Sequence, residues 1–157
     1  MPAPLVPVAI ALGSNLGDRG AHLAFAASRL GPYLTGLRLS SFIQTDPEGV
    51  PDIQPPFLNG AVVGRTELSP RALLDLLLAT ERERGRERPH RYAARTLDLD
   101  LILYGHRIVD EPGLVVPHPR FRERRFVLAP LAEVAGEWVD PVTGLSISAL
   151  LRRLGPS

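Results

Sequence analysis

The chain contains no cysteine in its 157 residues, which excludes disulfide bonds, thiolate metal ligands and cysteine nucleophiles. It also lacks any apolar run long enough to span a bilayer, and the apolar stretch near its start, PLVPVAIAL, has no basic leader. The formal net charge of +1 argues against a protein that binds nucleic acid through bulk positive charge. We therefore expect a cytoplasmic protein with no nucleic-acid partner and no membrane partner.

Two common catalytic motifs are missing as well. The stretch GSNLG does not match the G-x-x-x-x-G-K-[ST] pattern of a P-loop, and the chain has no lysine to complete one. No G-x-S-x-G sequence is present, so a serine hydrolase with a nucleophile elbow is poorly supported. Chemistry on a nucleotide would have to use another kind of site.

Because lysine is absent, all 18 basic residues other than histidine are arginines, and many of them lie in two clusters. Six fall between Arg82 and Arg95, and four fall between Arg120 and Arg125. A compositional bias accounts for the lack of lysine but not for this clustering. The planar, always-charged guanidinium suits phosphate oxygens, so the clusters favour a phosphate site. The alternative is a solvated surface in which glutamates balance the arginines.

The pattern of apolar residues predicts one α+β domain over residues 1–157. Alternating and helical periodicities, with Asp18 and Ser69 as helix caps, indicate strand, helix, strand, strand, helix and strand in that order. These elements are expected at 6–12, 21–30, 37–45, 57–66, 70–85 and 96–104, with additional C-terminal helices in 121–137 and 145–154. This is the order of a ferredoxin-like βαββαβ sandwich, in which we expect helices to cover one face of an antiparallel sheet.

The last predicted strand, TLDLDLILY, carries two carboxylates on one face, Asp98 and Asp100. The opposite, core-facing side is expected to hold Leu97, Leu99, Leu101 and Leu103. Side chains two apart on a strand lie roughly 6.5 Å apart, and at an effective dielectric near 20 two carboxylates at that distance repel by about 2 to 3 kcal/mol. An ion pair with a nearby arginine, or simple exposure, would relieve this repulsion. The other explanation is a Mg²⁺ site, because Mg²⁺ takes one or two carboxylates and completes its shell with water and phosphate oxygens.

Three further residues are candidates whose roles the pattern leaves open. Asn59 lies inside an apolar strand, where its amide either pairs with loop backbone or matches the polar edge of a heterocycle. His118, between two prolines, is either a surface residue or a catalytic one. Phe126 opens an apolar run and by itself is more typical of a core residue.

The chain resembles the 6-hydroxymethyl-7,8-dihydropterin pyrophosphokinases of folate synthesis along nearly its whole length. The stretches that carry the resemblance are ALGSNLGDR at 11–19, SSFIQTDP at 40–47, FLNGAV at 57–62, RTLDLDLILYG at 95–105 and VPHPRFRERRFVLAPL at 116–131. The resemblance implies a ferredoxin-like enzyme that transfers pyrophosphate from ATP to the hydroxymethyl group of the dihydropterin and releases AMP. Because the chain ends shortly after its last predicted helix, we expect a monofunctional enzyme, and we also expect a monomer or a weak homodimer.

The resemblance assigns site residues position by position. Asp98 and Asp100 correspond to the ligands of two Mg²⁺ ions, and together with Arg86 and Arg95 they form the expected catalytic group. The positions that correspond to ATP contacts are Glu81, Arg86, Arg88, Arg95, Leu101, His118 and Arg124. The positions that correspond to pterin contacts are Thr45, Asp46, Pro47, Glu48, Phe57, Asn59, Tyr92 and Phe126, with the ring stacked between the last two.

The chain departs from the usual family pattern in three places: the pterin site, the arginine-rich residues 82–95 (the arginine segment) and the nucleotide site. Phe57 stands where tyrosine is common, Tyr92 where tryptophan or phenylalanine is common, and Ala94 where proline is frequent. Gly113 and Val115 lack the polar side chains that some members turn toward ATP. We expect the segments 46–56 and 86–94 to act as lids.

Two other classes of function remain open from sequence. An RNA-binding ferredoxin-like domain would want aromatic platforms where this sheet face carries aspartates. A domain that senses a nucleotide without turnover would bind ATP but release no AMP.

Overall fold

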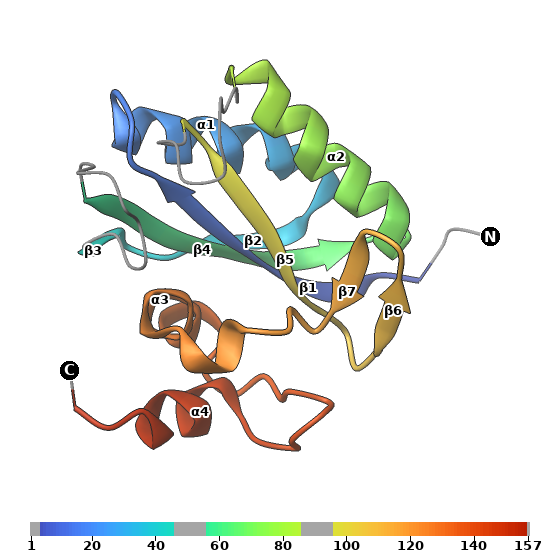
Figure 1. Ribbon diagram of the computed structural model, residues 1–157. Helices are drawn as coiled ribbons and strands as arrows, with labels where there is room; N and C mark the ends of the chain where they lie inside the picture. The colour runs from blue at the N-terminus through green and yellow to red at the C-terminus, as the bar shows by residue number, and fades with distance from the viewer. Residues whose placement is uncertain (1–3, 46–55, 86–95, 157) are drawn as a thin grey trace.

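The computed structural model describes residues 4–45, 56–85 and 96–156, and it contains a central sheet with helices on both sides (Figure 1). Its strands are β1 (Val6–Ser14), β2 (Thr35–Leu39), β3 (Ile43–Thr45), β4 (Phe57–Thr66), β5 (Asp98–Tyr104), β6 (Val109–Glu111) and β7 (Leu114–Val116). Its α-helices are α1 (Arg19–Leu30), α2 (Pro70–Glu83), α3 (Arg125–Ala135) and α4 (Ile147–Arg153), and the short 3₁₀ turns are η1 (Gly31–Tyr33) and η2 (Phe121–Glu123).

The main sheet has the order β2-β4-β1-β5, with β3 also paired to β4, and every pair in it is antiparallel. With β2 and β3 counted as the two parts of one interrupted strand, this is the predicted ferredoxin-like βαββαβ arrangement, which is therefore confirmed. The β6–β7 hairpin, which the sequence pattern did not predict, forms a second small sheet. No helix in the described part of the chain is long and apolar enough to cross a membrane.

Both predicted helix caps are present. The Asp18 carboxylate accepts a hydrogen bond from the Ala21 amide at 3.1 Å, and α1 starts at the next residue. The Ser69 hydroxyl accepts one from the Ala72 amide at 3.1 Å, and Pro70 occupies the first position of α2. Local sequence signals therefore determine where these two helices begin.

The predicted strand 37–45 is interrupted, because one extra residue lies between β2 and β3: Leu39 pairs with Val62, whereas Ile43 pairs with Asn59. The Ser40 amide donates to the Ala61 carbonyl at 2.9 Å, and its hydroxyl accepts from the Ala61 amide at 2.8 Å. After the break, the Phe42 ring lies over Gly60, where a Cβ atom would come within 2.8 Å of the ring. A glycine at position 60 therefore allows the chain to cross closely and resume pairing as β3.

The sheet is covered on both faces, whereas the sequence pattern predicted helices on one face only. Helices α1 and α2 pack on the first face, and α3 and α4 lie on the second (Figure 1). The first core includes Ile10, Leu23, Leu73, Leu77, Leu97, Leu99 and Leu101. The second core includes Ala9, Ala61, Val63, Ile102, Leu103, Phe121, Leu128, Leu131 and Ile147. The C-terminal helices bury the face that a four-stranded sandwich with two helices leaves open.

A bulge in β5 also changes the predicted alternation of leucines. Leu101 lies opposite Ile10, but Leu103 lies opposite Ala9, so Ile102 is an extra residue on β5. The bulge turns Leu103 into the second core beside Ile102, and the prediction that Leu103 shares a face with Leu101 is therefore wrong. The bulge comes after Asp100, so the alternation that separates the aspartates from the first core is intact.

Candidate functional site

The candidate site lies where β1 ends and β4 and β5 begin, on the second face of the sheet (Figure 1). Gly13 of β1 is paired with Asn59 of β4 on one side and with Asp98 of β5 on the other. Directly paired residues project to the same face, so the three positions form one row across the sheet. The next row on that face consists of Ala61, Ala11 and Asp100 in the same strand order.

Gly13 leaves a gap in the middle of the first row. The backbones of Asn59 and Asp98 are two strand spacings apart, about 10 Å. A Cβ atom at Gly13 would lie 3.4 Å from Asn59 Oδ1 and 3.8 Å from the Phe57 ring, so any side chain there would fill the space beside them. The sequence pattern ended the first strand at residue 12, whereas β1 continues to Ser14 and places this glycine inside the sheet.

Asp98 and Asp100 are both half-buried at the start of β5, and the residues next to them in the strand are buried. The two carboxylates therefore share the face that α3 covers, beyond the apolar part of the second core. Within the described residues, no group of three or more His, Asp or Glu side chains could hold a metal by itself. A carboxylate pair suits Mg²⁺, which takes one or two protein carboxylates and fills its remaining positions with water and phosphate oxygens.

His118 lies close to this pair, because its backbone amide donates to the Ile102 carbonyl at 3.1 Å. Burial lowers the pKa of the imidazole, and the nearby Arg124 guanidinium lowers it further, while Asp98 acts in the opposite direction. His118 Nδ1 accepts the Arg120 amide at 3.2 Å. The neutral ring therefore carries its proton on Nε2, where it can donate to an oxygen acceptor.

Arg124 and Phe126 lie together at the start of α3, and Arg124 is also close to His118. The Arg124 guanidinium lies over the Phe126 ring at 5.6 Å from its centroid. The Phe126 side chain is half-buried and packs against the second core. A cation and an aromatic face are thus available together, one for an anionic group and one for a planar group.

Asn59 is 5% exposed, and its Nδ2 donates a hydrogen bond to the Thr45 hydroxyl at 2.7 Å. Thr45 itself is paired with Phe57 at the end of β3. This contact orients the amide so that Oδ1 faces the space above Gly13. Three of the residues predicted to bind the heterocycle, Thr45, Phe57 and Asn59, are therefore brought together at one end of the β3–β4 pair.

Glu81, predicted to contact a nucleotide, is 2% exposed near the end of α2. Its Oε2 accepts a hydrogen bond from the Leu99 amide at 2.7 Å. That amide points away from β1, so Glu81 binds the outer edge of β5, beside which the described part of the chain places no further strand of the main sheet. The contact supports the strand that carries both aspartates, and a direct contact between Glu81 and a nucleotide stays a prediction.

Leu101 is 6% exposed, and its side chain belongs to the first core. Because backbone groups alternate along a strand, its amide and carbonyl face the same free edge as those of Leu99. A contact between Leu101 and ATP would therefore have to use the backbone. Gly113 occupies a turn position with φ of 76°, which favours glycine, so the missing polar side chain there follows from the hairpin.

Several predicted residues lie outside the described residues. In the arginine segment these are Arg86, Arg88, Tyr92, Ala94 and Arg95. In the segment 46–56 they are Asp46, Pro47 and Glu48. Most of the two predicted lids, 46–56 and 86–94, also falls there. Their roles stay predictions.

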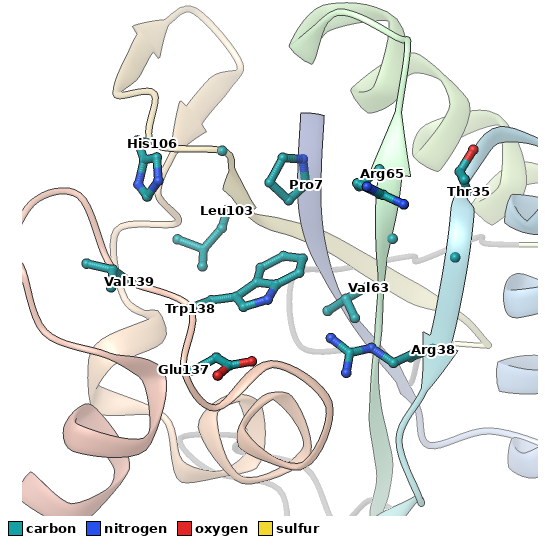
Figure 2. Close-up of a pocket in the computed structure, with 13 residues that line it drawn as sticks. Pro7, Thr35, Arg38, Val63, Arg65, Leu103, His106, Glu137, Trp138 and Val139 are labelled. Carbon is teal, nitrogen blue, oxygen red and sulfur yellow. The ribbon is translucent and has the colours of Figure 1, made fainter. Parts of the chain in front are cut away.

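A separate cavity of about 460 Å³ opens at the other end of the same sheet face (Figure 2). Figure 2 shows the Trp138 indole near Leu103 and Val63, with Arg38 and Arg65 nearby. Pro7 of β1 lines this cavity, and six residues of strand, about 20 Å, separate it from Gly13. The cavity therefore does not contain the aspartate pair and is distinct from the candidate site.

Comparison with known proteins gives consistent results for sequence and fold. Residues 9–136 match the family model described as 7,8-dihydro-6-hydroxymethylpterin-pyrophosphokinase (HPPK). A 2-amino-4-hydroxy-6-hydroxymethyldihydropteridine pyrophosphokinase of Synechocystis sp. is 42% identical over 148 residues, which cover 92% of this chain and 74% of that protein. The protein of the same name from Bacillus subtilis is 47% identical over 127 residues, covering 80% of this chain and 75% of its own.

A solved structure shows the same fold at low sequence identity. It is wild-type Plasmodium falciparum HPPK-DHPS with SDX-DHP, which matches with a TM-score of 0.76 at 13% identity. The match covers 96% of this chain and 44% of that one, so this chain spans less than half the length of the solved protein.

Proposed function

This chain belongs to the 7,8-dihydro-6-hydroxymethylpterin-pyrophosphokinase family, and we propose that it performs the family's reaction at the aspartate and asparagine site described above. The chain is an enzyme that transfers pyrophosphate from ATP to 6-hydroxymethyl-7,8-dihydropterin in folate synthesis. The proposed location of the site rests on one observation: Asn59 and Asp98 flank Gly13 in one row across the same sheet face.

The reaction forms one bond and breaks one. The hydroxymethyl oxygen of the pterin attacks the β-phosphorus of ATP, and the bond between that phosphorus and the oxygen that bridges to the α-phosphorus breaks. AMP leaves with the bridging oxygen, and the hydroxyl proton passes to solvent or to a nearby carboxylate. No side chain becomes covalently modified, so the residues act by position and charge.

We assign Asp98 and Asp100 as the residues that would hold Mg²⁺, with two ions expected when ATP is present. Their shared face and partial exposure fit an ion that needs further oxygen ligands from phosphates. When bound, Mg²⁺ would neutralise the triphosphate and stabilise the charge that develops on the transferred group.

His118 and Arg124 are the described residues best placed to hold phosphate oxygens. Burial and the nearby Arg124 lower the pKa of His118, which favours the neutral imidazole that donates through Nε2, while Arg124 supplies permanent charge. Arg86, Arg88 and Arg95 are proposed to complete this group from the arginine segment. Together these residues would orient the β-phosphorus toward the pterin hydroxyl.

We propose that the pterin lies at the Asn59 end of the row. The Asn59 amide, fixed by Thr45 at 2.7 Å, would read the polar edge of the heterocycle. Phe126 offers an aromatic face beside it, with Phe57 at the rim and Tyr92 as the second stacking partner. The ring would then project its hydroxymethyl group across Gly13 toward Asp98.

The test is AMP formation from ATP and 6-hydroxymethyl-7,8-dihydropterin, with Mg²⁺ and again with excess chelator. We expect AMP only when the pterin and Mg²⁺ are both present. AMP that forms at the same rate without pterin would exclude the proposed reaction, and ATP binding without any AMP would identify a nucleotide sensor instead. A single domain over 1–157, a monomeric or weakly dimeric state and a cytoplasmic location stay predictions.

A further inference from the structure

Arg19 joins three parts of the chain that meet beside the candidate pterin site. Its Nη1 donates a hydrogen bond to the Pro56 carbonyl at 2.8 Å. Its Nη2 donates a second one to Gln44 Oε1 at 3.0 Å. One guanidinium on α1 thus holds a residue of β3 and the residue that precedes β4.

The position of Arg19 in its own helix does not explain these contacts. It is the first residue of α1, where the helix dipole is positive and a cation is unfavourable. Asp18 already caps the helix through the Ala21 amide, so α1 does not need Arg19 for its start. A residue type that is unfavourable at its own helix position is expected to make a compensating contact elsewhere in the fold.

The contacts of Arg19 lie next to the residues assigned to the pterin. Gln44 precedes Thr45, and Pro56 precedes Phe57, the residue that pairs with Thr45. Thr45 in turn accepts the hydrogen bond that orients Asn59. The guanidinium is therefore one residue away from both members of the last β3–β4 pair.

We propose that Arg19 is a positioning residue for the pterin, which acts by holding the end of the β3–β4 pair so that Thr45 orients the Asn59 amide. This inference rests on the proposed function of the site. Arg19 does not touch the substrate; it limits the separation of the two strand ends. Its effect should be confined to the pterin side, because the aspartates on β5 are held by other contacts, including the one from Glu81.

Arginine is suited to this role because its two terminal nitrogens can donate to two acceptors at once. A lysine could reach one of the two acceptors as a point charge but could not reproduce the fork. We therefore expect Arg19→Ala to raise the KM for the pterin about tenfold and Arg19→Lys to raise it about threefold. The KM for ATP should stay within about twofold of the wild-type value.

Arg29 provides a matched control on the same helix. It lies in the last turn of α1, about 15 Å along the axis, and makes an ion pair with Glu83 at 2.9 Å at the protein surface. Arg29→Ala removes the same side chain without touching the β3–β4 pair. We expect it to leave the KM for the pterin unchanged.

The kinetic experiment measures AMP formation while the pterin is varied at saturating ATP, and then the reverse. Wild-type enzyme must form AMP in this assay, and its failure to do so would reject the proposed function and not the role of Arg19. With active wild type, an Arg19→Ala variant whose KM values for pterin and ATP rise equally would overturn the inference. So would an Arg19→Lys variant as impaired as Arg19→Ala.

Amide hydrogen exchange of the ligand-free protein gives a readout that does not depend on activity. We expect Arg19→Ala to speed amide exchange at residues 43–45 and 57–59, while the protection of amides in β1 and β5 is unchanged. Arg29→Ala should show no such local effect. Equal protection of 43–45 and 57–59 in wild type and Arg19→Ala would refute the proposed restraint, whether or not the kinetics change.

Discussion

Replacing Glu81 distinguishes support of the aspartate strand from direct contact with the nucleotide. The carboxylate is 2% exposed and accepts the Leu99 amide at 2.7 Å, so Glu81→Ala would leave that amide without its acceptor. A hydrogen bond to a charged group contributes about 1.5 to 3 kcal/mol to stability. We therefore expect Glu81→Ala to lower the free energy of unfolding by about 2 to 3 kcal/mol, because a buried contact to the edge of β5 is lost.

Two further variants separate the hydrogen bond from the charge. Glu81→Gln keeps an oxygen acceptor of nearly the same shape, and we expect the free energy of unfolding to fall by only about 1 to 2 kcal/mol. Glu83→Gln is the control on the same helix, since it removes one exposed ion pair with Arg29, and we expect a loss of about 0.5 kcal/mol or less.

The assays are urea unfolding followed by far-UV circular dichroism and calorimetric titration of the folded variants with ATP. If Glu81 supports the strand, Glu81→Gln loses stability but binds ATP with nearly wild-type affinity at temperatures where it is folded. The opposite result, unchanged stability with weakened ATP binding, would refute this reasoning and assign Glu81 to the nucleotide.

Three other changes give distinct outcomes. Asp100→Asn should lower kcat by about a hundredfold or more, while the melting temperature stays at or above the wild-type value, because the lost charge faces the site. Normal turnover in this variant would exclude Asp100 as a metal ligand. Phe126→Leu should weaken pterin binding about tenfold and leave ATP binding unchanged, as measured by titration, and equal losses for both ligands would contradict a stacking role. Burial alone would raise the pKa of Asp140, but hydrogen bonds from Arg122 and neighbouring groups lower it from 3.8 to about 2. The ionised carboxylate therefore stabilises the fold by about 2 kcal/mol. This stabilisation is complete above pH 3.8 and is lost as the pH falls toward 2. Asp140→Asn should therefore be less stable than wild type at pH 6 but lose less stability between pH 4 and pH 2, and parallel acid unfolding curves would show that the pair does not contribute.

The order of the elements could be predicted because it depends on short-range patterns. Helix starts follow from Asp18 and Ser69, whose side chains bind amides three residues away. The placement of Asp98 and Asp100 together on one strand face follows from simple alternation, which holds as long as the strand is regular. Alternation failed at Leu103, because a bulge is a property of the pairing with β1 and leaves no clear mark in the sequence of β5.

The sequence by itself determined the family, the ferredoxin-like order of strands and helices and the residue types available for phosphate and pterin recognition. Tertiary structure decided which of these residues meet. Gly13 separates Asn59 from Asp98 only because three strands align in one register, and no local pattern specifies that register. The contacts of Glu81 with Leu99 and of Arg19 with Pro56 join residues 18 and 37 positions apart, so they exist only once helices and strands have packed.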